Sequence, residues 1–318
     1  MGFGRVGASA RLAVLRQDVQ LRVLPIVLDY AGDLLVNLRG VAGLRCPART
    51  VFSNPDNSQP IMRTETICGR KVEIYDSIEE LPMARFHRYN KYLLVDAGVG
   101  SDISSFDSHI EKAIAYVRSS KADLAEAELE NLRQCVYMVQ TQVSPRYLSF
   151  AALVKSIDGQ PCDDISDDGL QRVVERLNNA PIGKLTAILE AVKKKIDREL
   201  QTYFPRLFDS ATTKECLDLM RRRALLQLDE IIEGENEKRT AQIERLTDEL
   251  LMYHKPQQFA GADSVEVAHD KHFERMNLLL SQNLNVDPKR YTVLEYYNAF
   301  ELLHDQMKEQ EKRTKKRK

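Results

Sequence analysis

The chain has 318 residues, of which 43% are hydrophobic and 29% are charged, and its formal net charge is −1. This length suffices for one large or two modest domains with hydrophobic cores, and the balanced charge excludes a surface that is basic all over, as a coat for nucleic acid would need. The five cysteines are widely spaced, which predicts reduced thiols in a cytoplasmic protein. The sequence has no apolar run of ~18 residues and no recognisable signal peptide, so we expect no membrane span.

Residues 1–61 differ in composition from the rest of the chain. They contain seven arginines and four aspartates but no lysine and no glutamate, whereas both are abundant from Met62 onward. Three interpretations stay open: a transit peptide, a small domain of its own, or upstream sequence translated from too early a start. We treat this segment as an atypical extension, which the third interpretation makes foreign to the native protein, and expect no function before Met62.

The first elements after Met62 are a hairpin and a helix. Polar and apolar residues alternate on both sides of Gly69-Arg70, which predicts a β-hairpin. Ser77 and Glu80 have the spacing of a capping box, and Pro82 can occupy the first turn of the helix that follows. The segment 96–102 should end this helix.

Two further helices are predicted before residue 143. The first places these apolar residues on one face: Phe106, Ile110, Ala113, Ile114 and Val117. The second spans about Lys121 to Gln142 and should turn these residues inward: Leu124, Leu132, Cys135, Val136 and Val139.

An acidic stretch follows a second predicted hairpin, which turns at Asp158-Gly159. From Asp164 to Glu175 the oxygen-bearing residues have nearly the spacing of a twelve-residue calcium loop. Such a loop needs a helix that runs straight into its first ligand, and Pro161 excludes that helix. We therefore predict that Ser166 caps the start of a helix, with acidic residues in its first turn.

The rest of the chain predicts long helices from their apolar stripes. The stripes are Leu185, Ile188, Leu189, Val192, Ile196 and Leu200; Leu217, Ala224, Leu228 and Ile231; and Ile243, Leu246, Leu250 and Tyr253. The last helix should begin at Thr292 in a capping box with Glu295.

The predicted fold class is mainly α, bundle-like, with one or two small β-hairpins. We expect four regions: the extension 1–61, a hairpin plus helices over 62–180, a helical region over 181–307, and a basic tail over 308–318.

The histidines are the candidates for metal or catalytic chemistry. His269 and His272 lie three residues apart and could share a helix face, as zinc ligands do, but further ligands would have to come from distant residues such as His254. His87 could line a pocket. The alternative is that these histidines are ordinary solvated or half-buried side chains without a chemical role. We predict no catalytic, metal-binding or cofactor-binding residue and no cofactor.

The last helix carries a candidate partner-binding face. Its members recur at alternating four- and three-residue spacing: Val293, Tyr297, Phe300, His304 and Met307. Leu294, Leu302 and Leu303 lie off this stripe and could pack against the rest of the fold, which would leave the stripe for a partner. The alternative is that all these residues belong to the core.

The C-terminal tail is basic, with seven Lys or Arg against two Glu from Lys308 onward. It is either a solvated helix end or an arm that contacts phosphates. The phosphate-contacting residues would be Lys312, Arg313, Lys315, Lys316, Arg317 and Lys318.

Four segments resemble proteins encoded in the structural-gene clusters of tailed bacteriophages and prophages, in particular tail-assembly chaperones. They are VEIYDSIEELPMARFHRYNKYLLVDAGVGSD, LVKSIDGQPCDDISDDGL, LQTYFPRLF and PKRYTVLEYYNAFELLHDQMKE. The resemblance extends over roughly 62–318 and implies a non-enzymatic role in building a phage particle, with no catalytic residues to transfer.

We therefore predict a non-enzymatic intracellular interaction protein, a virion (tail) assembly factor or structural component in the host cytoplasm or the virion. It would bind a protein partner or itself, and no membrane. One alternative is a nucleic-acid-associated protein that acts through its basic tail. The other is a metal-dependent hydrolase whose residues converge only in the folded chain.

Overall fold

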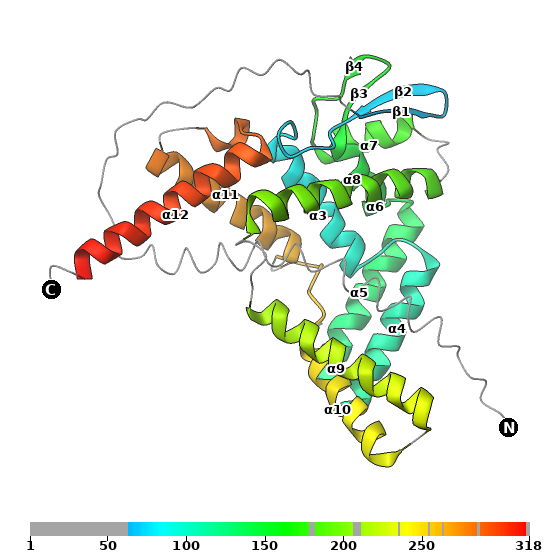
Figure 1. Cartoon of the computed structure of the whole chain (residues 1–318). Coiled ribbons are helices and arrows are strands. Elements are labelled where there is room, and N and C mark those ends of the chain that lie inside the picture. Colours follow the sequence, from blue (N-terminus) through cyan, green and yellow to red (C-terminus); the bar gives the residue numbers. More distant parts are fainter. Residues whose placement is uncertain are drawn as a thin grey trace. The chain divides into compact units, whose positions relative to one another are not determined.

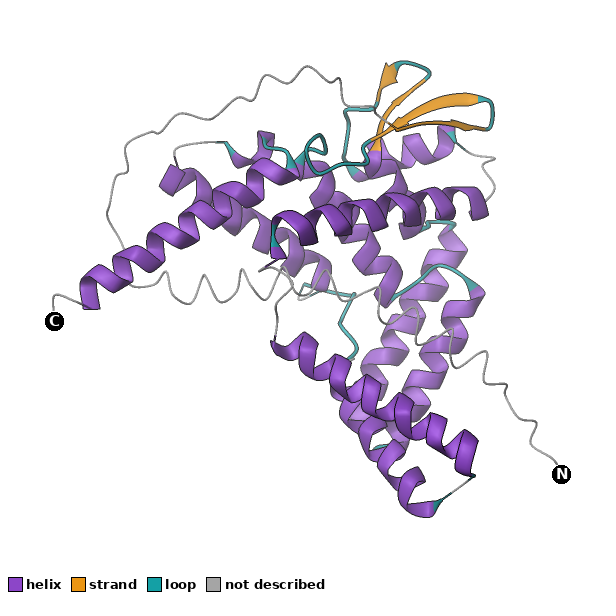
Figure 2. Cartoon of the chain, in the orientation of Figure 1, coloured by secondary structure: helices purple, strands orange, loops and turns teal. Residues whose placement is uncertain are grey.

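A computed structural model describes residues 63–177, 182–205, 211–234, 236–253, 255–262, 264–284 and 287–315. The extension 1–61 lies outside this description. The described part is mainly α-helical with one small antiparallel sheet, which confirms the predicted fold class (Figure 2). Within it, no helix combines the length and the apolar character that crossing a membrane requires.

The described residues form two compact units, each assembled from separate stretches of chain. We call them the helical unit, which comprises 97–143 and 211–265, and the mixed unit, which comprises 63–96, 144–205 and 266–315. Each unit is defined by the contacts between its residues, so it combines stretches that are distant from one another in the sequence. The segment predicted as one helical region, 181–307, is divided between the two units.

The sheet of the mixed unit contains both predicted hairpins. Its four strands are antiparallel in the order β1-β2-β3-β4 (Figure 1): β1 Arg63–Ile67, β2 Arg70–Ile74, β3 Val154–Ile157 and β4 Gln160–Pro161. The turns lie at Cys68-Gly69 and Asp158-Gly159, where all four φ angles are positive, between 51° and 77°. These angles suit two-residue hairpin loops whose twist matches that of the strands.

The helices of the mixed unit pack on this sheet and on one another. They are α3 Met83–Gly98, α6 Pro145–Leu153, α7 Asp167–Arg176, α8 Ile182–Tyr203, α11 Val265–Leu284 and α12 Val293–Lys315, with the short 3-10 helix η3 Pro288–Arg290 before α12. The centre of the core is apolar and fully buried: Ile67, Val72, Ile74, Ile78, Leu81, Leu153, Ile157, Leu170, Ile196 and Leu280.

Two of the three predicted helix caps are present. The Ser166 hydroxyl accepts a hydrogen bond from the Gly169 N–H at 3.1 Å and begins α7, so the acidic stretch is a helix start. Thr292 and Glu295 exchange backbone-to-side-chain hydrogen bonds at 2.9 and 3.3 Å. The capping box at Ser77 was wrong, because no helix begins there and the Ser77 hydroxyl donates instead to Glu199 at 3.1 Å.

A backbone latch joins the starts of α3 and α12. The Met83 N–H donates to the Tyr291 carbonyl at 2.8 Å, and the Val293 N–H donates to the Leu81 carbonyl at 2.9 Å. Between them, Pro82 and Thr292 form an isolated antiparallel bridge. The latch satisfies N–H groups that a helix start otherwise leaves without partners.

The structure corrects the predicted partner-binding face on α12. Val293, Tyr297 and Phe300 are at most 5% exposed, and the Tyr297 ring packs 5.4 Å from the ring of Phe204. These residues belong to the core of the mixed unit because α12 turns this stripe toward the other helices. His304 is half-buried, and the side chain of Met307 lies outside the description.

The basic tail also lies outside the described side chains. The helix α12 continues to Lys315, but nothing is described of the side chains of Lys312, Arg313 and Lys315 or of residues 316–318. The phosphate-contacting arm therefore stays a prediction.

The helical unit consists of two antiparallel helix pairs, α4 Ile103–Arg118 with α5 Ala122–Thr141 and α9 Ala211–Glu233 with α10 Glu237–Tyr253 (Figure 1). The Ser119 hydroxyl donates to Asp248 at 2.7 Å, which ties the two pairs together. Gly98 lies against the Phe259 ring so closely that a Cβ there would come within 2.1 Å of ring carbons. A larger residue at this position would require the Phe259 ring to move.

The pair α4–α5 confirms the predicted faces only in part: Ala113 and Cys135 are buried, but other apolar residues of these faces are exposed and polar residues are buried. His109 lies between Glu128, at 2.8 Å from its Nδ1, and the Val99 carbonyl, at 2.8 Å from its Nε2. Both side chains are buried. The apolar residues exposed on this pair are Ile103, Ile110, Ile114, Val117, Leu129, Val136, Tyr137 and Val139.

Candidate functional site

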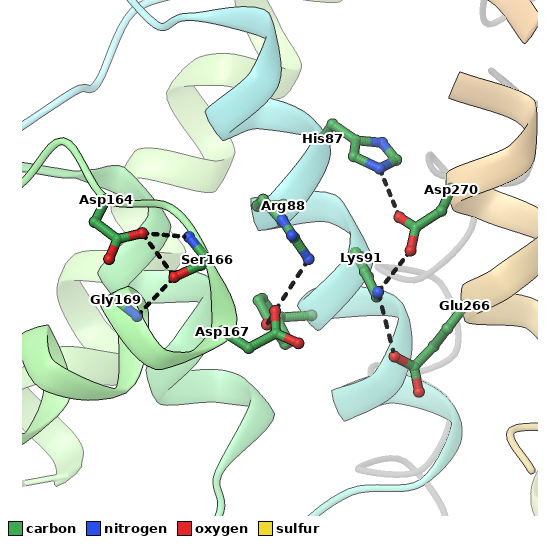
Figure 3. Close-up of polar contacts among 10 residues, drawn as sticks. His87, Arg88, Lys91, Asp164, Ser166, Asp167, Gly169, Glu266 and Asp270 are labelled. Carbon is green, nitrogen blue, oxygen red and sulfur yellow. Dashed lines mark hydrogen bonds and ion pairs between the residues drawn. The ribbon is translucent and has the colours of Figure 1, made fainter. Parts of the chain in front are cut away.

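A cluster of charged and aromatic side chains joins three helices of the mixed unit (Figure 3). We call it the α3 cluster. Its members are His87, Arg88, Lys91 and Tyr92 on α3, Asp167 on α7, and Glu266, His269 and Asp270 on α11. The spacings of one, three and four residues put the members of each helix on one side of it.

Asp270 is the centre of the cluster. Its Oδ2 accepts a hydrogen bond from Lys91 Nζ at 2.8 Å, and its Oδ1 lies 2.8 Å from His87 Nε2. Because a carboxylate can only accept, His87 carries its proton on Nε2. Burial opposes ionisation of Asp270, but the hydrogen bonds from Lys91 and His87 outweigh it, so the pKa of Asp270 is lowered.

Lys91 has a second carboxylate nearby. Its Nζ lies 3.7 Å from Glu266 Oε2, and the lysine itself is buried. Burial raises the pKa of Glu266, with partial compensation from the Lys91 charge. A buried ammonium is costly without a counter-charge, and Asp270 together with Glu266 supplies it.

Asp167 connects the same face of α3 to the first turn of α7. Its Oδ1 accepts hydrogen bonds from the Tyr92 hydroxyl at 2.6 Å and from Arg88 at 3.0 Å. Burial, followed by the contact with Asp167, raises the pKa of Tyr92, so its hydroxyl remains a donor. The cap at Ser166 fixes the start of α7 and hence the position of Asp167 (Figure 3).

Three side chains in the cluster are of metal-binding type. The possible ligand atoms of His87, His269 and Asp270 lie within 4.8 Å of one another. However, the His87 ring is stacked between His269, at 4.3 Å and 11°, and Phe273, at 4.0 Å and 10°. The lone pairs of imidazoles lie in their ring planes, so parallel rings cannot both direct them at one ion about 2.0–2.1 Å away. The set fits a metal poorly.

The stacked histidines are better explained as packing. Burial lowers the pKa of His269 to about 3, so this ring is neutral at pH 7 and packs as an aromatic side chain. Among the described residues, its Nδ1 is buried without a hydrogen-bond partner. Lys91 supplies the positive charge beside Asp270 that a metal would otherwise bring.

The His87–Asp270 pair has the form of a general base with an orienting carboxylate, but it is poorly placed for catalysis. Both faces of the His87 ring are covered, and burial lowers its pKa. Burial also raises the thiol pKa of Cys135 and of Cys162, which makes both thiols weak nucleophiles. We interpret the α3 cluster as a polar clamp that holds α11 and α7 against α3.

Sequence reasoning found only part of this cluster. It identified His269 as a candidate ligand, but it paired this residue with His272, which the clamp does not include. The real partners on α3 are about 180 positions away, His87 being 183 residues from Asp270. The signal in the sequence is a matching four-residue spacing, of His87 and Lys91 on one helix and of Glu266 and Asp270 on the other.

A second candidate site is the outer half of the α9–α10 pair, which we call the uncovered hairpin and define as residues 217–249. Cys216 and Leu250 are buried, but no described residue between them is. Yet α9 carries five large apolar residues here that are 46–79% exposed: Leu217, Leu225, Leu228, Ile231 and Ile232. The predicted buried stripe through Leu217, Leu228 and Ile231 was therefore wrong.

Exposed apolar side chains concentrate in the helical unit. Within the described part of the mixed unit, the large hydrophobic residues that are exposed are Tyr203, Leu278 and Leu302, on three different helices. Single exposed hydrophobic residues are ordinary, whereas a contiguous group marks an interaction surface. By this criterion the uncovered hairpin and the outer faces of α4 and α5 are the candidate interface.

Comparisons with family models, curated proteins and solved structures give no match to this chain.

Proposed function

We propose that the chain is a non-enzymatic interaction protein whose uncovered hairpin binds a partner protein. The observation that carries this proposal is the absence of any buried described residue across residues 217–249, despite five exposed Leu and Ile side chains on α9. Helices in proteins owe most of their stability to a covered apolar face rather than to intrinsic propensity. A partner would supply that cover.

The energy available from such cover is substantial. Complete burial of one Leu or Ile contributes about 1.5–3 kcal/mol. Five residues that are on average more than half exposed would contribute on the order of 5–9 kcal/mol in total, before the entropy cost of association is subtracted. The loss of translational and rotational freedom costs about 4–15 kcal/mol and offsets much of this, so a stable complex would also need contacts beyond these five side chains.

The setting that we propose is the assembly of a phage or prophage particle, with another assembly component as the partner, in the host cytoplasm or the virion. This proposal rests on the resemblance of the four sequence segments to phage morphogenesis proteins. Of the two alternatives, the metal-dependent hydrolase is disfavoured by the stacked geometry of His87 and His269. Nucleic-acid binding would have to act through the undescribed side chains of the tail.

Site-specific photo-cross-linking tests the proposal. A benzophenone amino acid is placed at Leu228 and, as the matched control, at Leu278, which is similarly exposed but lies on the mixed unit. In the native host cells, irradiation should give a discrete protein adduct from position 228 and none from position 278. An adduct pattern that is the same for both positions, or no adduct at all, would contradict the proposed function.

A further inference from the structure

We infer that the partner of the uncovered hairpin is the same hairpin of a second copy of this chain, with the two α9 helices packed antiparallel about a two-fold axis. This inference rests on the proposed function and specifies its partner. It is carried by the pattern of apolar and charged residues along the outer face of α9.

The outer face of α9 has the spacing of a helix–helix seam. Arg221, Leu225, Leu228 and Ile232 follow one another at intervals of four, three and four residues, which is the repeat of packed helical pairs. All four are exposed. The opposite side of α9 faces α10, because its residues are half-buried and Glu230 accepts a hydrogen bond from Thr240 on α10 at 3.0 Å.

The charges beside this seam are self-complementary. Arg222 and Asp229 are both exposed and lie seven residues apart, on the same flank of the seam. A two-fold axis between Leu225 and Leu228 would pair each of these leucines with the other in the second copy. It would also place Arg222 of one copy about two residues, or roughly 3 Å along the axis, from Asp229 of the other.

Symmetry then repeats the ion pair, so each interface would contain two of them. A parallel arrangement would instead place this flank of each helix against the opposite flank of the partner, which carries Ala224 and Ile231, so neither ion pair could form. The charge pattern therefore selects the antiparallel arrangement. The exposed Asp229 differs in this from two neighbouring carboxylates, which bind within the hairpin: Glu230 to Thr240, and Glu233 to Arg239.

Analytical ultracentrifugation of the purified full chain is the first test. We expect a monomer–dimer equilibrium between roughly 1 and 100 µM, as suits a short seam. Leu228→Asp should weaken dimerisation at least tenfold and leave the melting temperature of the monomer unchanged, whereas Leu278→Asp should leave the dimer intact. A wild-type chain that stays monomeric at 100 µM would overturn the inference.

A charge exchange tests the arrangement. Arg222→Glu and Asp229→Arg should each weaken self-association, because each places like charges together twice. Mixing the two single variants should restore the dimer as a heterodimer, since both ion pairs then form, one with its original polarity and one with reversed polarity. Mixed variants that associate no better than either alone would contradict the antiparallel seam.

The outcomes also separate this inference from the proposed function. If the purified chain is monomeric while the cross-linker at Leu228 captures a different protein, the hairpin is an interaction site and the second copy is not its partner. If Leu228→Asp strongly lowers the melting temperature of the monomer, this face is covered within the chain, and both proposals fail.

Discussion

Removing the carboxylate of Asp270 should loosen α11 from α3. Asp270 accepts hydrogen bonds from Lys91 and His87, both at 2.8 Å. Hydrogen bonds to a charged group contribute about 1.5–3 kcal/mol each, so the two together would amount to about 3–6 kcal/mol. The Asp270 side chain is 43% exposed, and solvent screening should reduce this by half. We expect Asp270→Ala to lower the free energy of unfolding by about 1.5–3 kcal/mol.

Urea denaturation at pH 7, followed by circular dichroism, measures this change. Glu274→Ala is the matched control, because Glu274 lies one turn further along α11 and forms an exposed ion pair with Lys289 at 2.8 Å. Such a pair contributes about 0–1 kcal/mol. In a double-mutant cycle with Lys91→Met, Asp270→Ala should show a coupling of about 1–2 kcal/mol. If Asp270→Ala costs no more than Glu274→Ala, the clamp does not hold α11.

Three further predictions concern pH, capping and the core. Burial lowers the pKa of His269 from 6.5 to about 3. Below pH 6.5 the unfolded chain therefore binds a proton that the folded chain does not, and the free energy of unfolding should fall as the pH drops toward 3. His269→Phe should flatten this pH dependence, as measured by urea titrations at several pH values. Ser166→Ala should lower the melting temperature through a loss of about 0.5–2 kcal/mol, equally with calcium and with EDTA; a calcium-dependent difference would restore the calcium-loop interpretation. Phe300→Ala should cost about 3–5 kcal/mol in urea denaturation, because this ring is buried; a folded, fully stable variant would instead favour the predicted partner-binding face.

Local signals in the sequence predicted local structure well. The turn at Asp158-Gly159, the cap at Ser166 and the capping box of Thr292 with Glu295 each depend on the conformation of a few adjacent residues. The exception was Ser77, where a correct capping spacing was overridden by Glu199, a residue 122 positions away. A distant carboxylate that competes for the same hydroxyl leaves no trace in a four-residue pattern.

The sequence could not show which apolar stripe is covered. The stripes on α9 and α12 look alike in sequence, yet Leu228 is 53% exposed and Phe300 only 4%. Periodicity identifies a face of a helix, but the neighbour that covers it comes from elsewhere in the chain. The polar clamp was hidden for the same reason, since His87 and Asp270 meet only when α3 and α11 pack together.

The latch between α3 and α12 has a consequence for synthesis on the ribosome. The N–H of Met83 cannot reach its acceptor until Tyr291 has been made, more than 200 residues later. At about 5–20 residues per second, this interval lasts roughly 10–40 s. For most of that time α3 exists without α11 and α12, and the apolar surface that they later cover stays open to chaperones and to neighbouring nascent chains. The mixed unit is therefore completed only after α12 has been made, however early its first strands are made.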